Sequence, residues 1–251
     1  MKVKFFFLLL FFNSCFSTDN KVLVRNNGET QGSFYHIQYL SDYGNNYKFQ
    51  IDSILLEIDS SLSIYQDFST ISKLNNKETL IVDSLFSNVF NVAKYVYIHT
   101  EGYFDCSVFP LVKEWGFYNN RLSDSIIIDS LNFQNILKHV GFDKINLAND
   151  SLFLPDNMML DFNSIAQGYS VDIIAQFLES HSIDDYLIEI GGELKAKGKN
   201  VDGEVWKVGI DKPQKDIDVN ERFQFIIELE NKALATSGNY RRFYEKDGVK
   251  Y

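Results

Sequence analysis

The chain has 251 residues, of which 45% are hydrophobic and 23% are charged, a composition typical of a folded globular protein. A chain of this length can bury a sizeable core as one large or two small domains. Its formal net charge of −10, with no local cluster of Lys and Arg, argues against nucleic acid as a partner.

The first residues have the pattern of a bacterial lipoprotein signal. Lys2 and Lys4 precede an unbroken apolar run over residues 5–12. This run is too short to span a bilayer as a stable anchor, but it suits the hydrophobic region of a signal peptide. Cys15 directly follows a small residue, which resembles a lipobox. We therefore expect a signal peptide over residues 1–14 and a lipidated Cys15.

On this interpretation the mature protein is a lipoprotein, anchored to a membrane on the extracytoplasmic (periplasmic) side. Residues 15–30 are expected to form a lipid-anchored linker and residues 31–251 the folded domain. Loss of two lysines with the signal peptide changes the net charge to (24 − 2) − 34 = −12. Simple secretion with an incidental Cys15 is the alternative. Cys106 is then the remaining cysteine, so the sequence offers no disulfide framework, and a buried thiol is expected there.

Hydrophobic spacing predicts a mixture of helices and strands along the domain. Strands are expected at 31–39, 186–190, 205–210 and 223–229, with a strand-like apolar segment at 152–160; helices are expected at 48–63, after an Asp83 cap, at 131–140 and after residue 161; a loop is expected at 102–117. These elements do not alternate as regular βαβ units, which favours an α+β fold.

The segment Asp161–Asp172 is the most informative part of the chain. It leads from the apolar segment through small residues into an amphipathic helix, so free backbone N–H groups and a positive dipole end face whatever binds there. Asp161 adds a carboxylate, Ser164 an oxygen suited to a hard cation, and Gly168 permits close backbone approach. The pattern indicates a site for a phosphorylated ligand with a magnesium-like ion. An ordinary capped surface helix is the alternative.

Further short runs occur in a fixed order along almost the whole domain. They are Thr30–Ser33, Leu62–Tyr65, Ser69–Asn75, Thr100–Asp105, Pro110–Phe117, Asp161–Asp172, Ile188–Gly192 with Gly198, and Ala235–Arg241. Each is weak alone, but the ordered series is specific. With these motifs the sequence resembles the ApbE family, the FAD:protein FMN transferases.

The resemblance implies an ApbE-like α+β fold and a defined chemistry. Members of the family bind FAD and, with Mg²⁺, cleave its pyrophosphate. They pass the FMN half to a Thr hydroxyl of a partner protein, here expected to be a membrane redox subunit, and release AMP. Some members instead hydrolyse FAD to FMN and AMP.

The resemblance also implies site residues. The flavin contacts of the family fall on Gln31, Tyr65, Tyr103, Phe104, Asp105, Asp161 and Gln167, and its metal-binding oxygen before the helix falls on Ser164. Physically, Tyr65 can stack on a ring, and Asp161 can accept hydrogen bonds from a sugar or a ring edge.

The sequence departs from the family pattern in three places. Gln31 replaces a common Met, and Gln167 stands where many members have Lys, which removes a cation near the phosphates. The family motif His-x-Ile-Asp-Pro-x-Thr-Gly, whose Asp and Thr complete the metal site, normally lies just beyond the position of Tyr251 and is lacking here, so the flavin transferase domain over residues 31–251 is expected to lack its C-terminal part. Two alternatives to the transferase therefore stay open at this point: a non-catalytic flavin- or nucleotide-binding lipoprotein, and an FAD pyrophosphatase.

Overall fold

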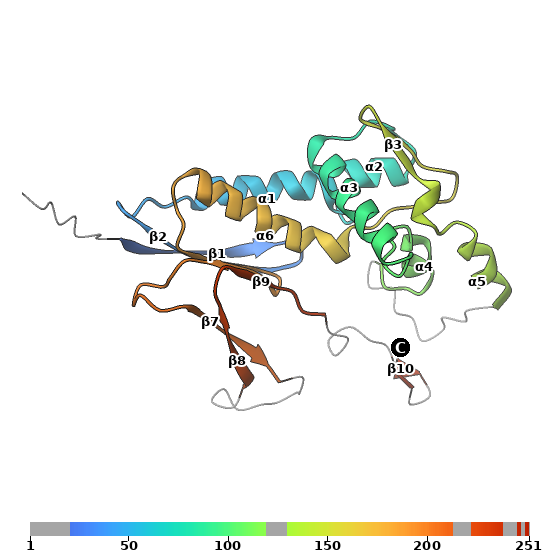
Figure 1. Cartoon of the computed structure of the whole chain (residues 1–251). Helices are drawn as coiled ribbons and strands as arrows, with labels where there is room; N and C mark the ends of the chain where they lie inside the picture. Colours follow the sequence, from blue (N-terminus) through green and yellow to red (C-terminus); the bar gives the residue numbers. More distant parts are fainter. Residues whose placement is uncertain (1–20, 119–129, 213–221, 238–244, 247–248, 251) are drawn as a thin grey trace, which may run out of the picture.

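The computed structural model describes residues 21–118, 130–212, 222–237, 245–246 and 249–250. It combines an antiparallel sheet, two long helices packed on one face of that sheet, and a second helical region beside them (Figure 1). The expected α+β fold class is confirmed.

The sheet has five strands in the order β1-β2-β5-β6-β9, and each neighbouring pair is antiparallel. These strands are β1 (Val22–Thr30), β2 (Ser33–Ser41), β5 (Tyr186–Ile190), β6 (Glu193–Lys197) and β9 (Lys232–Leu234). Gln31 and Gly32 form the two-residue turn between β1 and β2, with φ values of 52° and 69°. Positive φ at both central positions is what the tight turn of a hairpin requires.

The linker expected over residues 15–30 is wrong for residues 22–30, which form β1. This strand pairs with β2 along its whole length, from Val22 opposite Ser41 to Thr30 opposite Ser33. Its sequence is polar and lacks a regular apolar alternation, so pairing with the neighbouring strand, rather than its own pattern, determines its conformation.

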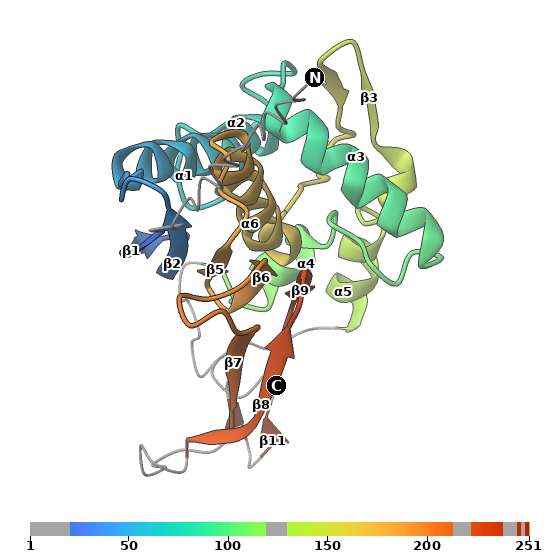
Figure 2. The same ribbon diagram turned by 60° about the vertical axis from the view of Figure 1, so that its left-hand side comes forward.

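The helices α1 (Lys48–Leu62) and α6 (Asn163–Ser180) cover one face of the sheet (Figure 2). Both bury the face that their helical spacing predicts, and the expected helix at 48–63 is confirmed. The core between helices and sheet comprises Val24, Tyr35, Ile37, Tyr39, Ile51, Leu55, Val171, Ile174, Ala175, Leu178, Ile183, Tyr186, Ile188 and Ile190.

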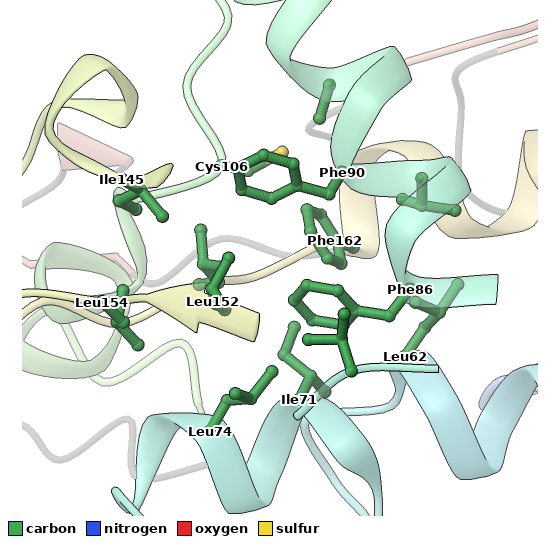
Figure 3. Close-up of a cluster of buried hydrophobic side chains, with 14 of the residues drawn as sticks. Leu62, Ile71, Leu74, Phe86, Phe90, Cys106, Ile145, Leu152, Leu154 and Phe162 are labelled. Carbon is green, nitrogen blue, oxygen red and sulfur yellow. The ribbon is translucent and has the colours of Figure 1, made fainter. Parts of the chain in front are cut away.

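The second core is formed by shorter elements. They are α2 (Thr70–Asn75), α3 (Ser84–His99), α4 (Phe109–Glu114), α5 (Ser130–Leu137), η1 (Phe142–Lys144), β3 (Asn146–Ala148) and β4 (Ser151–Phe153). Figure 3 shows Phe86 and Phe90 of α3 facing Phe162 and Leu152 inside this cluster. Phe162 is fully buried and immediately precedes α6, so this core fixes the start of that helix.

Several local expectations need correction. Only residues 152 and 153 of the apolar segment 152–160 are strand; in the rest, Leu154, Met158 and Leu160 are buried without a sheet partner. The expected loop at 102–117 contains α4, with Pro110 in its first turn, where a missing N–H costs nothing. The helix expected at 131–140 ends at Leu137.

The expected cap at Asp83 is confirmed, because its carboxylate accepts the N–H of Phe86 at 2.8 Å.

The strands β7 (Trp206–Asp211) and β8 (Phe223–Leu229) form a hairpin that projects from the sheet (Figure 2). A small pair, β10 (Glu245–Lys246) and β11 (Val249–Lys250), follows. Among the described residues, no helix is both long and apolar enough to cross a bilayer.

Candidate functional site

The start of α6 brings together residues from distant parts of the chain. Asn163 is the first helical residue, and its backbone N–H donates to Oδ1 of Asp161 at 2.7 Å. The Asn163 side-chain amide donates both to Oδ2 of Asp161 and to the hydroxyl of Tyr65, each at 3.4 Å. Tyr65 and Asp161, two of the expected flavin contacts, therefore meet at one place through Asn163.

Tyr65 presents an aromatic surface beside this helix start. Its ring stacks on that of Tyr118, with centroids 5.7 Å apart and planes inclined by 23°. The Tyr118 hydroxyl donates to the carbonyl of Ile64 at 3.0 Å, which fixes the pair. The Tyr65 ring is still half exposed, so a planar ligand can pack against it.

Burial changes the pKa of the carboxyl group of Asp161 at this site. Burial raises the pKa of the Asp161 carboxyl above its usual value, while the hydrogen bonds from Asn163 oppose that change. The backbone N–H of Asp161 donates to the carbonyl of Cys106 at 2.8 Å, which ties the segment to the second core. The carboxylate is thus held in place in surroundings that favour a partner able to donate hydrogen bonds.

Ser164 lies within the first turn of α6, not before the helix as expected. Its side chain makes a hydrogen bond to the Cys106 thiol, whose pKa is raised by burial to about 12. Such a thiol stays protonated at neutral pH and is not a nucleophile, as expected for Cys106. The hydroxyl of Ser164 and the carboxylate of Asp161 are the two hard oxygen donors that this part of the site provides.

Two further expected residues, Gln31 and Gln167, are found farther along the same helix: Gln167 belongs to α6, and Gln31 contacts it from the β1–β2 turn. The Gln31 amide nitrogen donates to the hydroxyl of Ser170 at 2.6 Å, so the β1–β2 turn is attached to α6. The backbone N–H of Gln31 is accepted by Asp59 of α1, whose pKa is raised by burial and lowered in part by this bond. The amide oxygen of Gln31 is buried and accepts no hydrogen bond from the described residues.

Gln167 lies against the turn between β5 and β6. A β-carbon at Gly191 would collide with the Gln167 amide, so the glycine leaves the room that this side chain occupies. Gly191 also has a φ of 62°, where side chains are disfavoured. Beyond the turn, Glu193 accepts the backbone N–H of Thr236, and burial raises its pKa.

These contacts bring the expected residues together along one side of α6, which we call the α6 face. Asn163, Gln167 and Ser170 are spaced i, i+4 and i+7, and residues at this spacing share one side of a helix. Tyr65 lies at the first of them and Gln31 at the last. The α6 face thus offers an aromatic ring, a carboxylate and two amides in a row.

The run Tyr103–Asp105 immediately precedes Cys106, whose carbonyl accepts the backbone N–H of Asp161. Tyr103 is 95% exposed, and Phe104 packs against the second core. Asp105 accepts the backbone N–H and the hydroxyl of Ser107 at 2.7 and 2.6 Å, and the N–H of Phe142 at 3.3 Å. The described contacts of Asp105 thus stabilise its own loop and attach it to η1.

A magnesium site is only partly built. Among the described residues, no group of three or more His, Cys, Asp or Glu side chains could hold a metal ion. Mg²⁺ requires nearly octahedral coordination by oxygen, so Ser164 and Asp161 alone do not fit it. Further oxygens would have to come from the ligand, from water or from residues outside the described ranges.

A model of the ApbE family matches residues 31–251. The chain belongs to the ApbE family. The resemblance drawn from the motif series is confirmed.

Relatives in this family are FAD:protein FMN transferases. One from Vibrio cholerae is 34% identical over 235 residues, covering 89% of this chain and 68% of the relative. One from Haemophilus influenzae is 32% identical over 240 residues, again covering 89% and 68%. The alignment with the Escherichia coli transferase, at 30% identity, covers 76% of this chain and 55% of that protein.

Solved ApbE structures have the same fold. The flavin transferase ApbE from Vibrio cholerae superposes with a TM-score of 0.79 at 32% identity, covering 92% of this chain and 75% of that one. The flavinyl transferase ApbE of Pseudomonas stutzeri gives a TM-score of 0.80 at 28% identity, covering 92% and 73%.

Sequence reasoning missed four residues that organise the α6 face in this ApbE protein. They are Asp59, Tyr118, Asn163 and Ser170. Asn163 and Ser170 lie in the motif at helical spacing from Gln167, so that periodicity could have indicated them. Asp59 and Tyr118 act through tertiary contacts that no local pattern reveals.

Proposed function

We propose that this chain moves FMN from FAD to a Thr of a target protein in a Mg²⁺-dependent reaction. The observation that carries the proposal is the α6 face, where Tyr65, Asp161, Gln167 and Gln31 line up beside the start of a helix. The names of the relatives support the same reaction, since they are FAD:protein FMN transferases.

The proposed reaction exchanges one phosphorus–oxygen bond for another. The Thr hydroxyl oxygen attacks the phosphorus of the FMN half of the pyrophosphate. The bond from that phosphorus to the bridging oxygen breaks, AMP leaves with that oxygen, and the hydroxyl proton is released to solvent. The target is proposed to be a Thr-bearing subunit of a membrane redox protein.

Each residue of the α6 face has a role that its chemistry suits. Tyr65 stacks on the planar part of the ligand, and Asp161 accepts hydrogen bonds from it. Gln31 and Gln167 offer neutral amides, whereas many relatives of this family are expected to use Met and Lys. N–H groups at the start of α6 favour the negatively charged phosphates.

Mg²⁺, when bound, would neutralise charge on the pyrophosphate oxygens as the bond breaks. Ser164 is the residue of this chain that we propose as its ligand. Because the described residues build only part of that site, a non-catalytic flavin-binding protein is the second candidate.

The test incubates the full chain with FAD, Mg²⁺ and the Thr-bearing subunit. Covalent flavin on the subunit is followed by in-gel fluorescence, and AMP by chromatography. We expect both products together, and neither with chelator; a target whose Thr is replaced by Val is the matched control. AMP and FMN without covalent flavin would indicate an FAD pyrophosphatase instead. FAD binding without AMP would indicate the non-catalytic protein.

We also propose that the protein is held at the extracytoplasmic face of a membrane by a lipid on Cys15. The support is the signal-like sequence before that residue, which has a short apolar run after two lysines. Mass spectrometry of the membrane-extracted protein measures the acyl chains directly, and an unmodified N-terminal peptide would contradict the anchor.

A further inference from the structure

Exposed apolar side chains occur on several parts of the molecule, and two highly exposed aromatic rings lie near the end where the described chain begins. Tyr43 is 88% exposed and Phe49 is 80% exposed, although most aromatic rings of this size are covered in folded proteins. Val22 and Val201 are about half exposed, and the segments that carry them, the start of β1 and the β6–β7 connection, lie at the same end (Figure 1). We call this surface, formed by these four residues, the entry end.

Contacts between distant segments make the entry end one surface. Val22 is the first residue of β1, and it lies 3.5 Å from the position of a β-carbon on Gly44, next to Tyr43. Phe49 follows in the first turn of α1. Figure 1 shows the start of β1, the loop before α1 and the β6–β7 connection at one end of the sheet.

An ion pair ties the last of these segments to the start of the described chain. Lys21 Nζ lies 2.7 Å from a carboxylate oxygen of Asp185, and the other oxygen of that carboxylate accepts the N–H of Lys199 at 2.9 Å. The connection that carries Val201 is thereby held beside the point where the chain enters β1. The segments that carry the four apolar residues therefore lie at the end of the sheet where the described chain begins.

The length of that segment limits how far the entry end can be from a lipid on Cys15. Lys21 is 21 − 15 = 6 residues beyond Cys15. A fully extended chain spans at most about 3.5 Å per residue, so these residues reach about 20 Å. A lipidated Cys15 would hold the entry end close to the headgroups of the bilayer.

Charge does not explain an attraction to the membrane. The mature chain would carry (24 − 2) − 34 = −12, which anionic lipids repel. Two lysines near the entry end also have carboxylate partners: Lys21 pairs with Asp185, and Lys48 pairs with Asp52 at 2.8 Å. Contact would depend on the aromatic and aliphatic side chains, and Tyr is a residue type favoured at the headgroup level.

We propose that the entry end rests on the bilayer surface, with Tyr43 and Phe49 inserted among the headgroups. The proposal rests on the lipid anchor at Cys15. Such a contact would also fix the distance between the bilayer surface and the α6 face. β1 has 9 residues and runs from Val22 at the entry end to the Gln31 turn, a distance of about 30 Å. The target would then have to present its Thr about 30 Å above the membrane.

The test places an environment-sensitive fluorophore on single cysteines of the full chain. The lipidated protein is extracted from membranes and reconstituted in phosphatidylcholine vesicles, with and without a spin-labelled lipid that quenches at headgroup depth. Tyr43→Cys and Phe49→Cys are the test positions. Ile98→Cys, at the far end of α3 and also exposed, is the matched control. Cys106 is buried with a pKa of about 12, so it does not compete for the label.

We expect quenching of about twofold or more at positions 43 and 49 and almost none at position 98. Vesicle-bound protein in which all three labels stay unquenched would overturn the surface contact but leave the anchor in place. Unacylated protein that stays in the supernatant would overturn both. FAD binding of the same samples is measured separately, so the proposed transferase function is judged on its own readout.

Discussion

Asp161 is a carboxylate whose surroundings disfavour its charge. Burial raises its pKa, and the two hydrogen bonds from Asn163 compensate only in part. An Asp whose pKa is raised in the folded state destabilises the fold at pH values above that pKa. The penalty decreases as the pH falls toward the value of an unfolded Asp. Because the charged form of Asp161 destabilises the fold, its carboxylate is a candidate for a role in ligand binding and not in stabilising the fold.

We therefore predict opposite effects of Asp161→Asn on stability and on binding. The amide keeps an oxygen for the Asn163 N–H but removes the buried charge, so the melting temperature at pH 7 should be unchanged or higher. FAD affinity should fall by about 1–3 kcal/mol because a charged acceptor is lost. Thermal melting at pH 7 and pH 4 and titration calorimetry measure these quantities; the stability gain should be smaller at pH 4.

Asp156→Asn, at an exposed position, is the control and should change neither quantity. Loss of stability together with unchanged FAD affinity would assign Asp161 a purely structural role.

The meeting of Tyr65 and Asp161 shows what sequence can predict at the scale of residues. Both follow from motif position, whereas the bridge between them depends on Asn163, whose neighbours are known only once the chain is folded. For Tyr103 the side chain is almost fully exposed, and the flavin contact that the motif indicates stays a prediction. A motif therefore identifies residue types and leaves their surroundings undetermined.

At the scale of elements, the turn between β5 and β6 contributes to the site because it has a glycine, Gly191, where a side chain would collide with Gln167. Gly191 allows the Gln167 amide to lie where a β-carbon would otherwise be. The amide is therefore held between α6 and the turn, and its position depends on both elements. Its role in FAD binding can be tested without altering Gln167 itself.

We predict that Gly191→Ala weakens FAD binding about tenfold, because the new methyl group displaces Gln167 from the α6 face. The matched control is Gly203→Ala. Gly203 also has positive φ, 76° against 62° for Gly191, but no atom lies near its β-carbon position. Both variants should lose about 1 kcal/mol of stability from backbone strain, measured by denaturant unfolding. Only Gly191→Ala should change the affinity in calorimetry, and equal affinities would remove Gln167 from the site.

Periodic elements were predictable and paired or irregular elements were not. The apolar spacing of α1 and the Asp83 cap of α3 are encoded locally, and both are confirmed. β1 carries few apolar residues and owes its conformation to pairing with β2. The segment after β4 is as apolar as a strand, yet it fills the second core without sheet hydrogen bonds. Local patterns indicate burial more reliably than they indicate hydrogen-bonding partners.

The whole molecule places its two surfaces at opposite ends of the sheet. The α6 face runs from the first residues of α6 to Ser170, where the Gln31 turn contacts the helix, while β1 begins and α6 ends at the other end of the sheet. The first turns of α6 therefore extend beyond the β1–β2 turn. The α+β class was predictable from the mixture of periods, but this separation depends on the strand order.

The same separation leads to a prediction about the anchor. Cys15→Ser should move the full chain from the membrane fraction to the soluble extracytoplasmic fraction. The serine lacks the thiol to which the lipid would be attached, so the protein loses its anchor. FAD affinity should not change, since the α6 face lies about 30 Å from the entry end. Flavin transfer to a target in the same membrane should slow at least tenfold, because tethering raises the effective concentration of two partners on one surface.

Transfer to a detergent-solubilised target should be unaffected, which separates the effect of tethering from an effect on catalysis. Continued membrane association of the Ser variant would contradict the lipid anchor, and equal transfer rates in membranes would show that tethering does not limit the encounter.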